Sequence, residues 1–109
     1  MPGSATETAP EVAPPKVRPA PRYHVVLLDD DDHTYDYVIE MLGRLFHYDL
    51  QKAYSLALEV DTVGRVIVLT TVLEQAEFKR DQIHAYGADW RLERSAGSMS
   101  AIIEPAPGA

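Results

Sequence analysis

The chain has 109 residues, no cysteine and a formal net charge of -7 at pH 7. This length is typical of one domain, and the lack of cysteine excludes disulfides, thiolate zinc sites and cysteine nucleophiles. The acidic balance argues against a nucleic-acid-binding surface, because neutralising phosphates requires clustered Lys and Arg. No apolar run approaches the ~20 residues of a membrane span, and no basic segment followed by an apolar one marks a signal peptide. We therefore expect a cytoplasmic protein that contacts neither nucleic acid nor membrane.

Residues 1–21 hold six of the eight prolines and few large apolar side chains. Such a segment cannot bury enough apolar area to offset the entropy lost on ordering. We therefore predict a disordered Pro/Ala-rich tail over residues 1–21, one folded domain over residues 22–104, and a frayed C-terminus over residues 105–109.

The first half of the domain predicts one strand and two helices. A β-branched and apolar run over residues 24–28 is typical of a buried strand. Apolar residues at helical spacing then predict a helix over residues 38–46 with Thr34 as its N-cap. The same spacing over residues 53–60 predicts a second helix, with Asp49 as N-cap and Gly64 at its end.

The second half alternates strand and helix. Residues 65–71 predict a strand, residues 73–86 a helix followed by Gly87, and residues 99–104 a last short strand. In the polar connection between them, Trp90 is expected to cap the core. The order β-α-α-β-α-β predicts a small α+β sandwich: a three-stranded, mostly antiparallel sheet with three helices on one face.

Four consecutive aspartates, Asp29 to Asp32, follow the first strand. Adjacent carboxylates raise one another's pKa, so the run requires either solvent or a cation. If strand geometry continues past residue 28, Asp29 and Asp31 share one side of the chain. Two converging carboxylates form an acceptor-only site, which suits a hard cation or an organic ammonium.

Apolar side chains follow the run at Tyr35, Val38 and Ile39. Carboxylates beside an apolar wall match a ligand with a positive group and an apolar group, such as the first residue of a polypeptide. A solvated loop and a metal site of His33 with two aspartates remain alternatives. The sequence argues against a phospho-acceptor receiver domain, because that domain requires further strands and an Asp at the end of a central strand. It also contains no hydrolase motif.

The residues from 25 to 42, VVLLDDDDHTYDYVIEML, resemble the opening of the ClpS family, adaptors that deliver N-degron substrates to Clp unfoldases. That family begins with an apolar strand, Asn-Asp-Asp and an amphipathic helix. Residues 45–49 (LFHYD), 60–65 (VDTVGR), 76–79 (AEFK) and 101–104 (AIIE) are similar to its later parts in the same order. The resemblance covers roughly residues 22–104.

The resemblance implies that Asp29, Asp31 and Asp61, flanked by Asp30, hold the α-ammonium of a substrate. The pocket for the first side chain would be lined by His33, Tyr35, Val38, Ile39, Ala57, Val60 and Met99.

The resemblance also implies a non-enzymatic, monomeric adaptor without cofactor or metal. Its third helix would contact a Clp AAA+ unfoldase of the ClpA or ClpC type through Glu77 and Lys79, and its tail would be engaged by that unfoldase. The alternatives are a ClpS-like module that binds the unfoldase without recognising N-degrons, and a small acidic metal-binding protein.

Three positions depart from the family pattern. Asp29 stands where Asn is usual, Asp61 where His is usual, and Tyr35 where a Met guards the pocket. The two aspartates add negative charge at the ammonium site, which remains compatible with a cation, including an N-terminal Arg or Lys. Tyr35 is expected to narrow or reshape the side-chain pocket.

Overall fold

A computed structural model describes residues 20–107 of the chain. The predicted tail therefore lies outside the described residues except for its last two positions, and residues 108–109 also lie outside. The elements are, in order, β2 (Arg22–Leu28), α1 (Tyr35–Phe46), α2 (Leu50–Val63), β3 (Arg65–Val72), α3 (Leu73–His84) and β4 (Ala101–Pro105). This order confirms the predicted α+β fold.

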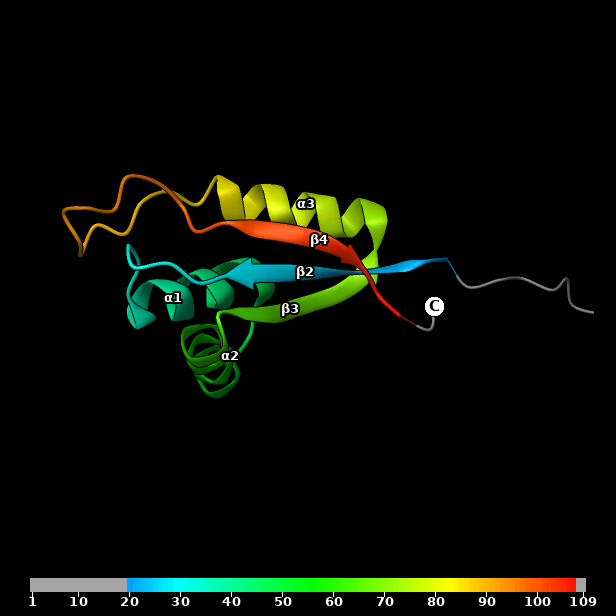
Figure 1. Ribbon diagram of the computed structural model, residues 1–109, viewed down its shortest axis with the longest axis horizontal. Helices are drawn as coiled ribbons and strands as arrows, with labels where there is room; N and C mark the ends of the chain where they lie inside the picture. Colours follow the sequence, from blue (N-terminus) through cyan, green and yellow to red (C-terminus); the bar gives the residue numbers. More distant parts are fainter. Residues whose placement is uncertain (1–19, 108–109) are drawn as a thin grey trace, which may run out of the picture.

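The sheet has the order β3-β2-β4, and both pairings are antiparallel. The central strand β2 turns Val25 and Leu27 into the core shared with the helices. Its neighbour Val26 lies opposite Ile67 and Ile102 on the other face of the sheet. In Figure 1, α2 lies next to β3 and α3 runs along β4.

The two predicted N-caps are confirmed. The Thr34 hydroxyl accepts a hydrogen bond from the backbone N–H of Tyr37 at 3.1 Å, and the Asp49 carboxylate accepts one from the N–H of Lys52 at 2.8 Å. These bonds satisfy backbone donors that the first helical turn leaves free. The capped helices then bury the predicted apolar faces, with Met41 and Leu42 of α1 fully inside.

The last two elements begin or end about two residues from their predicted bounds. The third helix ends at His84. Beyond it, the N–H of Tyr86 donates to the carbonyl of Ile83 three residues earlier, so the chain tightens into a 3-10 turn. The last strand begins at Ala101, and Met99 before it is buried at 2% exposure. The pairing with β2 extends one residue beyond β4, where the N–H of Ala106 donates to the carbonyl of Arg22.

Within residues 20–107, no helix combines the length and the apolar character needed to cross a bilayer.

Gly64 joins α2 to β3 and also positions the acidic run. It adopts a left-handed conformation with φ of 98° and caps α2 through its N–H on the carbonyl of Val60. Its own carbonyl accepts a hydrogen bond from the N–H of Asp29 at 3.0 Å. One glycine therefore ends the second helix and holds the residue that follows β2.

We expect Gly64→Ala to lower the free energy of unfolding by about 1 kcal/mol, because an L-residue in the left-handed region is strained. Urea unfolding measures the change. Gly97→Ala is the control: its added Cβ also meets nothing within 4 Å, but its backbone has no positive φ. Equal losses in the two variants would contradict this account of Gly64.

Candidate functional site

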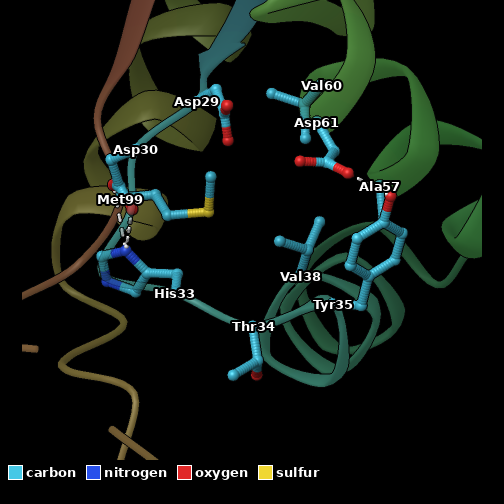
Figure 2. A pocket seen from close by; sticks show the side chains of 10 residues that line it. All are labelled: Asp29, Asp30, His33, Thr34, Tyr35, Val38, Ala57, Val60, Asp61 and Met99. Carbon is cyan, nitrogen blue, oxygen red and sulfur yellow. Dashed lines mark hydrogen bonds and ion pairs between the residues drawn. The ribbon is translucent and has the colours of Figure 1, made fainter. Parts of the chain in front are cut away.

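A pocket of about 50 Å³ opens where β2 ends, between the first turn of α1 and the last turns of α2. Figure 2 shows the side chains around it. Its lining residues are Asp29, Asp30, His33, Thr34, Tyr35, Val38, Ala57, Val60, Asp61 and Met99.

The floor of the pocket is apolar and its rim is acidic. Val38, Ala57, Val60 and Met99 are all buried. The carboxylates of Asp29 and Asp61 point toward the same space (Figure 2). The site therefore offers oxygen acceptors directly beside an apolar surface.

No basic side chain of residues 20–107 forms an ion pair with these two carboxylates. Among the described residues, the ion pairs include neither Asp29 nor Asp61. Asp29 is exposed overall, but partial desolvation of its carboxylate raises its pKa, the negative charge of Asp61 raises it further, and the N–H of Asp30 partly offsets the rise. A positive ligand group would remove the repulsion between the two carboxylates, so the site favours a cation.

Tyr35 closes the rim on the side of α2. Its hydroxyl donates to Asp61 Oδ2 at 2.6 Å. This hydrogen bond favours the neutral phenol and raises the pKa of Tyr35 to about 12. The ring also lies beside that of Tyr54 on α2, with 6.0 Å between the ring centres.

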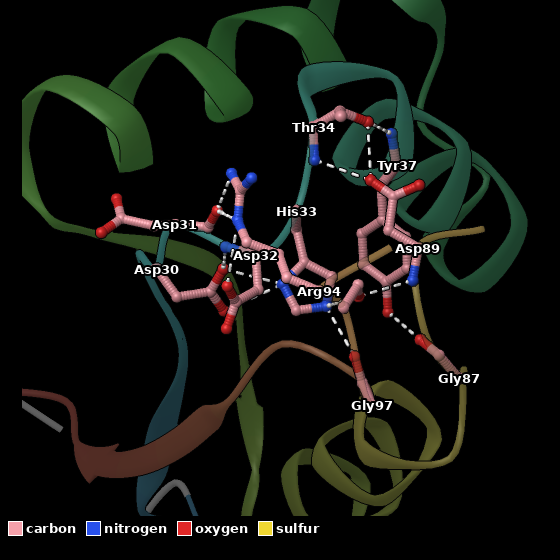
Figure 3. A network of polar contacts seen from close by, with 11 residues as sticks. Asp30, Asp31, Asp32, His33, Thr34, Tyr37, Gly87, Asp89, Arg94 and Gly97 are labelled. Carbon is pink, nitrogen blue, oxygen red and sulfur yellow. Dashed lines mark hydrogen bonds and ion pairs between the residues drawn. The ribbon is translucent and has the colours of Figure 1, made fainter. Parts of the chain in front are cut away.

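Two of the other three acidic side chains of the run have ion-pair partners in the structure. Asp30 pairs with His33 Nδ1 at 2.7 Å, and Asp32 pairs with Arg94 Nε at 3.3 Å. Arg94 also donates to the backbone carbonyl of Asp31, whose carboxylate extends away from this network in Figure 3. Only Asp29 of the four therefore faces the pocket without an ion-pair partner.

The expectation that Asp29 and Asp31 share a side is wrong. The strand β2 ends at Leu28 and the chain bends at Asp31 and Asp32, so strand alternation does not continue. The N–H of Asp32 bonds back to Asp30 Oδ1, which stabilises the bend. Asp29 and Asp30 consequently line the pocket, whereas Asp31 does not.

The structure brings together most of the residues expected at the pocket. Asp61 and six of the seven expected side-chain contacts line it, and Thr34 joins them. Ile39 does not line it; it packs against the core from a partly buried position. The residues that coincide with the expected set are His33, Tyr35, Val38, Ala57, Val60 and Met99.

His33 connects the acidic turn to the loop before β4. Its side chain is 4% exposed, and its Nε2 lies 2.6 Å from the carbonyl of Gly97 while Nδ1 faces Asp30. Both ring nitrogens are thus engaged. In residues 20–107, no group of three or more His, Asp or Glu side chains is placed to hold a metal ion.

Asp89 is a buried carboxylate that sequence reasoning missed. It is 1% exposed and accepts hydrogen bonds from the N–H and hydroxyl of Thr34, both at 2.8 Å, and from Arg91. Burial alone would raise the pKa of Asp89, but these hydrogen bonds outweigh it and lower the pKa to about 2. No spacing pattern in the sequence marks this residue.

Trp90 does not cap the core, contrary to expectation. It is 80% exposed and packs on the guanidinium of Arg91 at 4.6 Å. Asp89 takes the inward position instead, because its carboxylate completes the N-terminal end of α1 at Thr34. The loop is therefore fastened by polar contacts rather than by its large aromatic side chain.

The two residues expected to contact an unfoldase lie on α3 and differ in accessibility. Glu77 is exposed, and Phe78 beside it is 54% exposed. Lys79 is partly buried: its ammonium donates to the carbonyl of Leu45 near the end of α1 and lies 5.2 Å from the ring of Phe46.

The sequence matches a known family over most of its length. The family model described as "ATP-dependent Clp protease adaptor protein ClpS" matches residues 18–90. The Clp protease adapter protein ClpS of Hydrogenovibrio crunogenus is 40% identical over 79 residues, which cover 72% of this chain and 76% of that protein. The ClpS of Alkalilimnicola ehrlichii is 32% identical over 104 residues and 94% of each chain.

A solved structure has the same fold. The structure of Agrobacterium tumefaciens ClpS2 bound to L-phenylalaninamide superposes with a TM-score of 0.70 at 19% identity, covering 81% of this chain and 100% of that one. The family match and the curated relatives agree with the resemblance seen in the sequence. The chain belongs to the ClpS family of ATP-dependent Clp protease adaptor proteins.

Proposed function

We propose that this adaptor binds the N-terminal residue of other proteins in the pocket at the end of β2 and delivers those proteins to a Clp AAA+ unfoldase. The observation that carries the proposal is the pair of carboxylates, Asp29 and Asp61, that face one space above an apolar floor and have no ion-pair partner in the described part of the chain.

The α-ammonium of a polypeptide fits this pair. It carries a positive charge and several N–H donors, whereas ionised carboxylates only accept. Each charge-assisted hydrogen bond contributes about 1.5–3 kcal/mol before the repulsion between the carboxylates is counted. Asp30 is held by His33 at the edge of the site and adds negative potential.

The first side chain of the substrate would lie on Val38, Ala57, Val60 and Met99. The pocket of about 50 Å³ is smaller than a cavity of about 150 Å³ that holds benzene. A small first side chain therefore fits with Tyr35 in place, and an aromatic one requires Tyr35 to move. The ClpS2 structure contains L-phenylalaninamide, which joins a free amino group to a benzyl side chain.

The unfoldase would dock on α3, with Glu77 and Lys79 as the candidate contacts. Glu77 is directly accessible, and Lys79 sets the position of α3 against the end of α1. We propose a monomeric, non-enzymatic adaptor in the cytoplasm, with an unfoldase of the ClpA or ClpC type as its partner.

Calorimetric titration with peptides that begin with Phe, Leu, Tyr, Trp, Arg or Gly tests the proposal. We expect some of the free-amine peptides to bind with a Kd near the micromolar range, about -8 kcal/mol. N-acetylation removes the charge and should weaken binding at least about tenfold.

The same titrations with and without Ca²⁺ separate the alternatives. Binding of Ca²⁺ without peptide would support the acidic metal-binding protein. Binding of purified unfoldase but of no peptide would support a module without N-degron recognition. Equal binding of free and acetylated peptides would remove the assigned role of the carboxylates.

A further inference from the structure

One face of α2 exposes a line of large apolar side chains. Leu50, Tyr54 and Leu58 are 71%, 50% and 43% exposed. Residues four apart lie above one another on a helix, so these three side chains form one continuous stripe and are not isolated apolar residues on the surface. The stripe lies apart from the buried face of α2, which Ala53, Ala57 and Val60 form.

The stripe begins at the mouth of the pocket. The ring of Tyr54 lies 6.0 Å from that of Tyr35, whose hydroxyl donates to Asp61. Asp61 follows Leu58 by three residues and therefore lies on the same side of the helix. The acidic rim and the apolar stripe are thus one continuous surface.

The opposite rim of the pocket is covered by the loop before β4. His33 is bonded to Gly97, and Arg94 is bonded to Asp31 and Asp32. Figure 2 shows His33 and Asp30 on one side of the pocket and Asp61 with Tyr35 on the other. A substrate whose first residue lies in the pocket can therefore continue on the uncovered side of the rim, over α2.

The spacing of the stripe matches an extended chain. Four helical residues advance about 6 Å, and alternate side chains on one side of an extended peptide are about 6.6–6.8 Å apart. Lys52, a basic side chain of the same helix, lies over the ring of Tyr48 at 4.1 Å. The stripe therefore suits uncharged, apolar side chains.

We propose that the segment following the N-terminal residue of a substrate runs extended along Leu58, Tyr54 and Leu50. Apolar side chains at the third and fifth residues of the substrate, counted from its N-terminus, then increase affinity. This inference rests on the proposed function. It names the class of substrate: N-terminal segments with alternating apolar side chains.

Fluorescence anisotropy with two octapeptides tests it. Both carry a free amine and the first residue that binds best in the panel above; positions three and five are Leu in one and Ser in the other. Full-length protein should bind the Leu peptide about tenfold more tightly, because each Leu buries apolar area on the stripe.

Variants on α2 assign that difference to the stripe. Leu50→Ser with Leu58→Ser should reduce the preference for the Leu peptide to less than about twofold. Val63→Ser is the matched control: Val63 is 65% exposed on the same helix but lies five residues, or about 140°, beyond Leu58, and should retain the preference.

The outcomes separate the two proposals. Binding that requires the free amine but shows no preference for Leu, or a preference that survives in the double variant, overturns the stripe alone. Failure of every panel peptide to bind, or equal binding after acetylation, overturns the proposed function and the stripe with it.

Discussion

We expect Asp29→Ala and Asp61→Ala each to weaken the binding of a free-amine peptide by about 10- to 100-fold, since each would remove a charge-assisted hydrogen bond to the α-ammonium. Asp31→Ala is the matched control, because this neighbour in the same acidic run does not line the pocket; we expect its affinity to stay within about twofold. Titration calorimetry at low ionic strength measures all three.

The pH dependence of binding has a defined sign. Burial and the charge of Asp61 raise the pKa of Asp29, so its protonated form accumulates in the free protein at a higher pH than for an ordinary aspartate. Binding of a cationic peptide should weaken as the pH falls through that raised pKa, and this dependence should diminish in Asp29→Ala.

The stability of Asp29→Ala distinguishes a binding role from a structural one. A carboxylate whose pKa is raised by folding disfavours the folded state at neutral pH, so its removal should not lower the midpoint of urea unfolding.

A loss of affinity in Asp31→Ala as large as in Asp29→Ala would contradict the assignment of the pocket.

Asp89→Ala has the largest expected effect on stability. It removes the acceptor of Thr34 and Arg91 and leaves buried donors unpaired, which costs about 3 kcal/mol. Asp81→Ala is the control, because the ion pair of Asp81 with Arg80 is exposed and such pairs contribute at most about 1 kcal/mol. Urea unfolding at neutral pH measures both.

The contribution of Asp89 also defines a pH window. The pKa of Asp89 is about 2 in the folded protein, below the ordinary value of 3.8. The stabilisation, about 2 kcal/mol, is therefore fully present above pH 4 and is lost as the pH falls toward 2. Asp89→Asn should lack this part of the acid dependence, and parallel stability curves for both proteins between pH 4 and 2 would refute it.

Local patterns predicted the elements because each depends on nearby residues. Helical spacing in α1 and α2 reflects one buried face, and the caps at Thr34 and Asp49 act within three residues. The end of α3 was misplaced by two residues because Gly87 suggested a stop, whereas the chain tightens earlier at Tyr86.

The candidate site was predicted only where the chain is regular. Val38, Ala57 and Val60 follow from helix faces, and they line the pocket. The acidic turn depends on partners far along the chain, Arg94 and Gly97, so no local rule revealed which aspartates face inward. Asp89 was missed for the same reason, since its main partner Thr34 is 55 residues away.

The junctions between elements are very short. β3 ends at Val72 and α3 begins at Leu73, while Gly64 alone separates α2 from β3. The helix that bears Asp61 is thus joined to the helix that bears Glu77 by Gly64 and β3 alone. This connection contains no flexible linker through which binding at the pocket could change binding at α3. We therefore expect the affinity of the pocket for an N-terminal residue to be independent of the affinity of α3 for an unfoldase. The adaptor would then link its two partners passively, and the ternary complex would form through two independent equilibria.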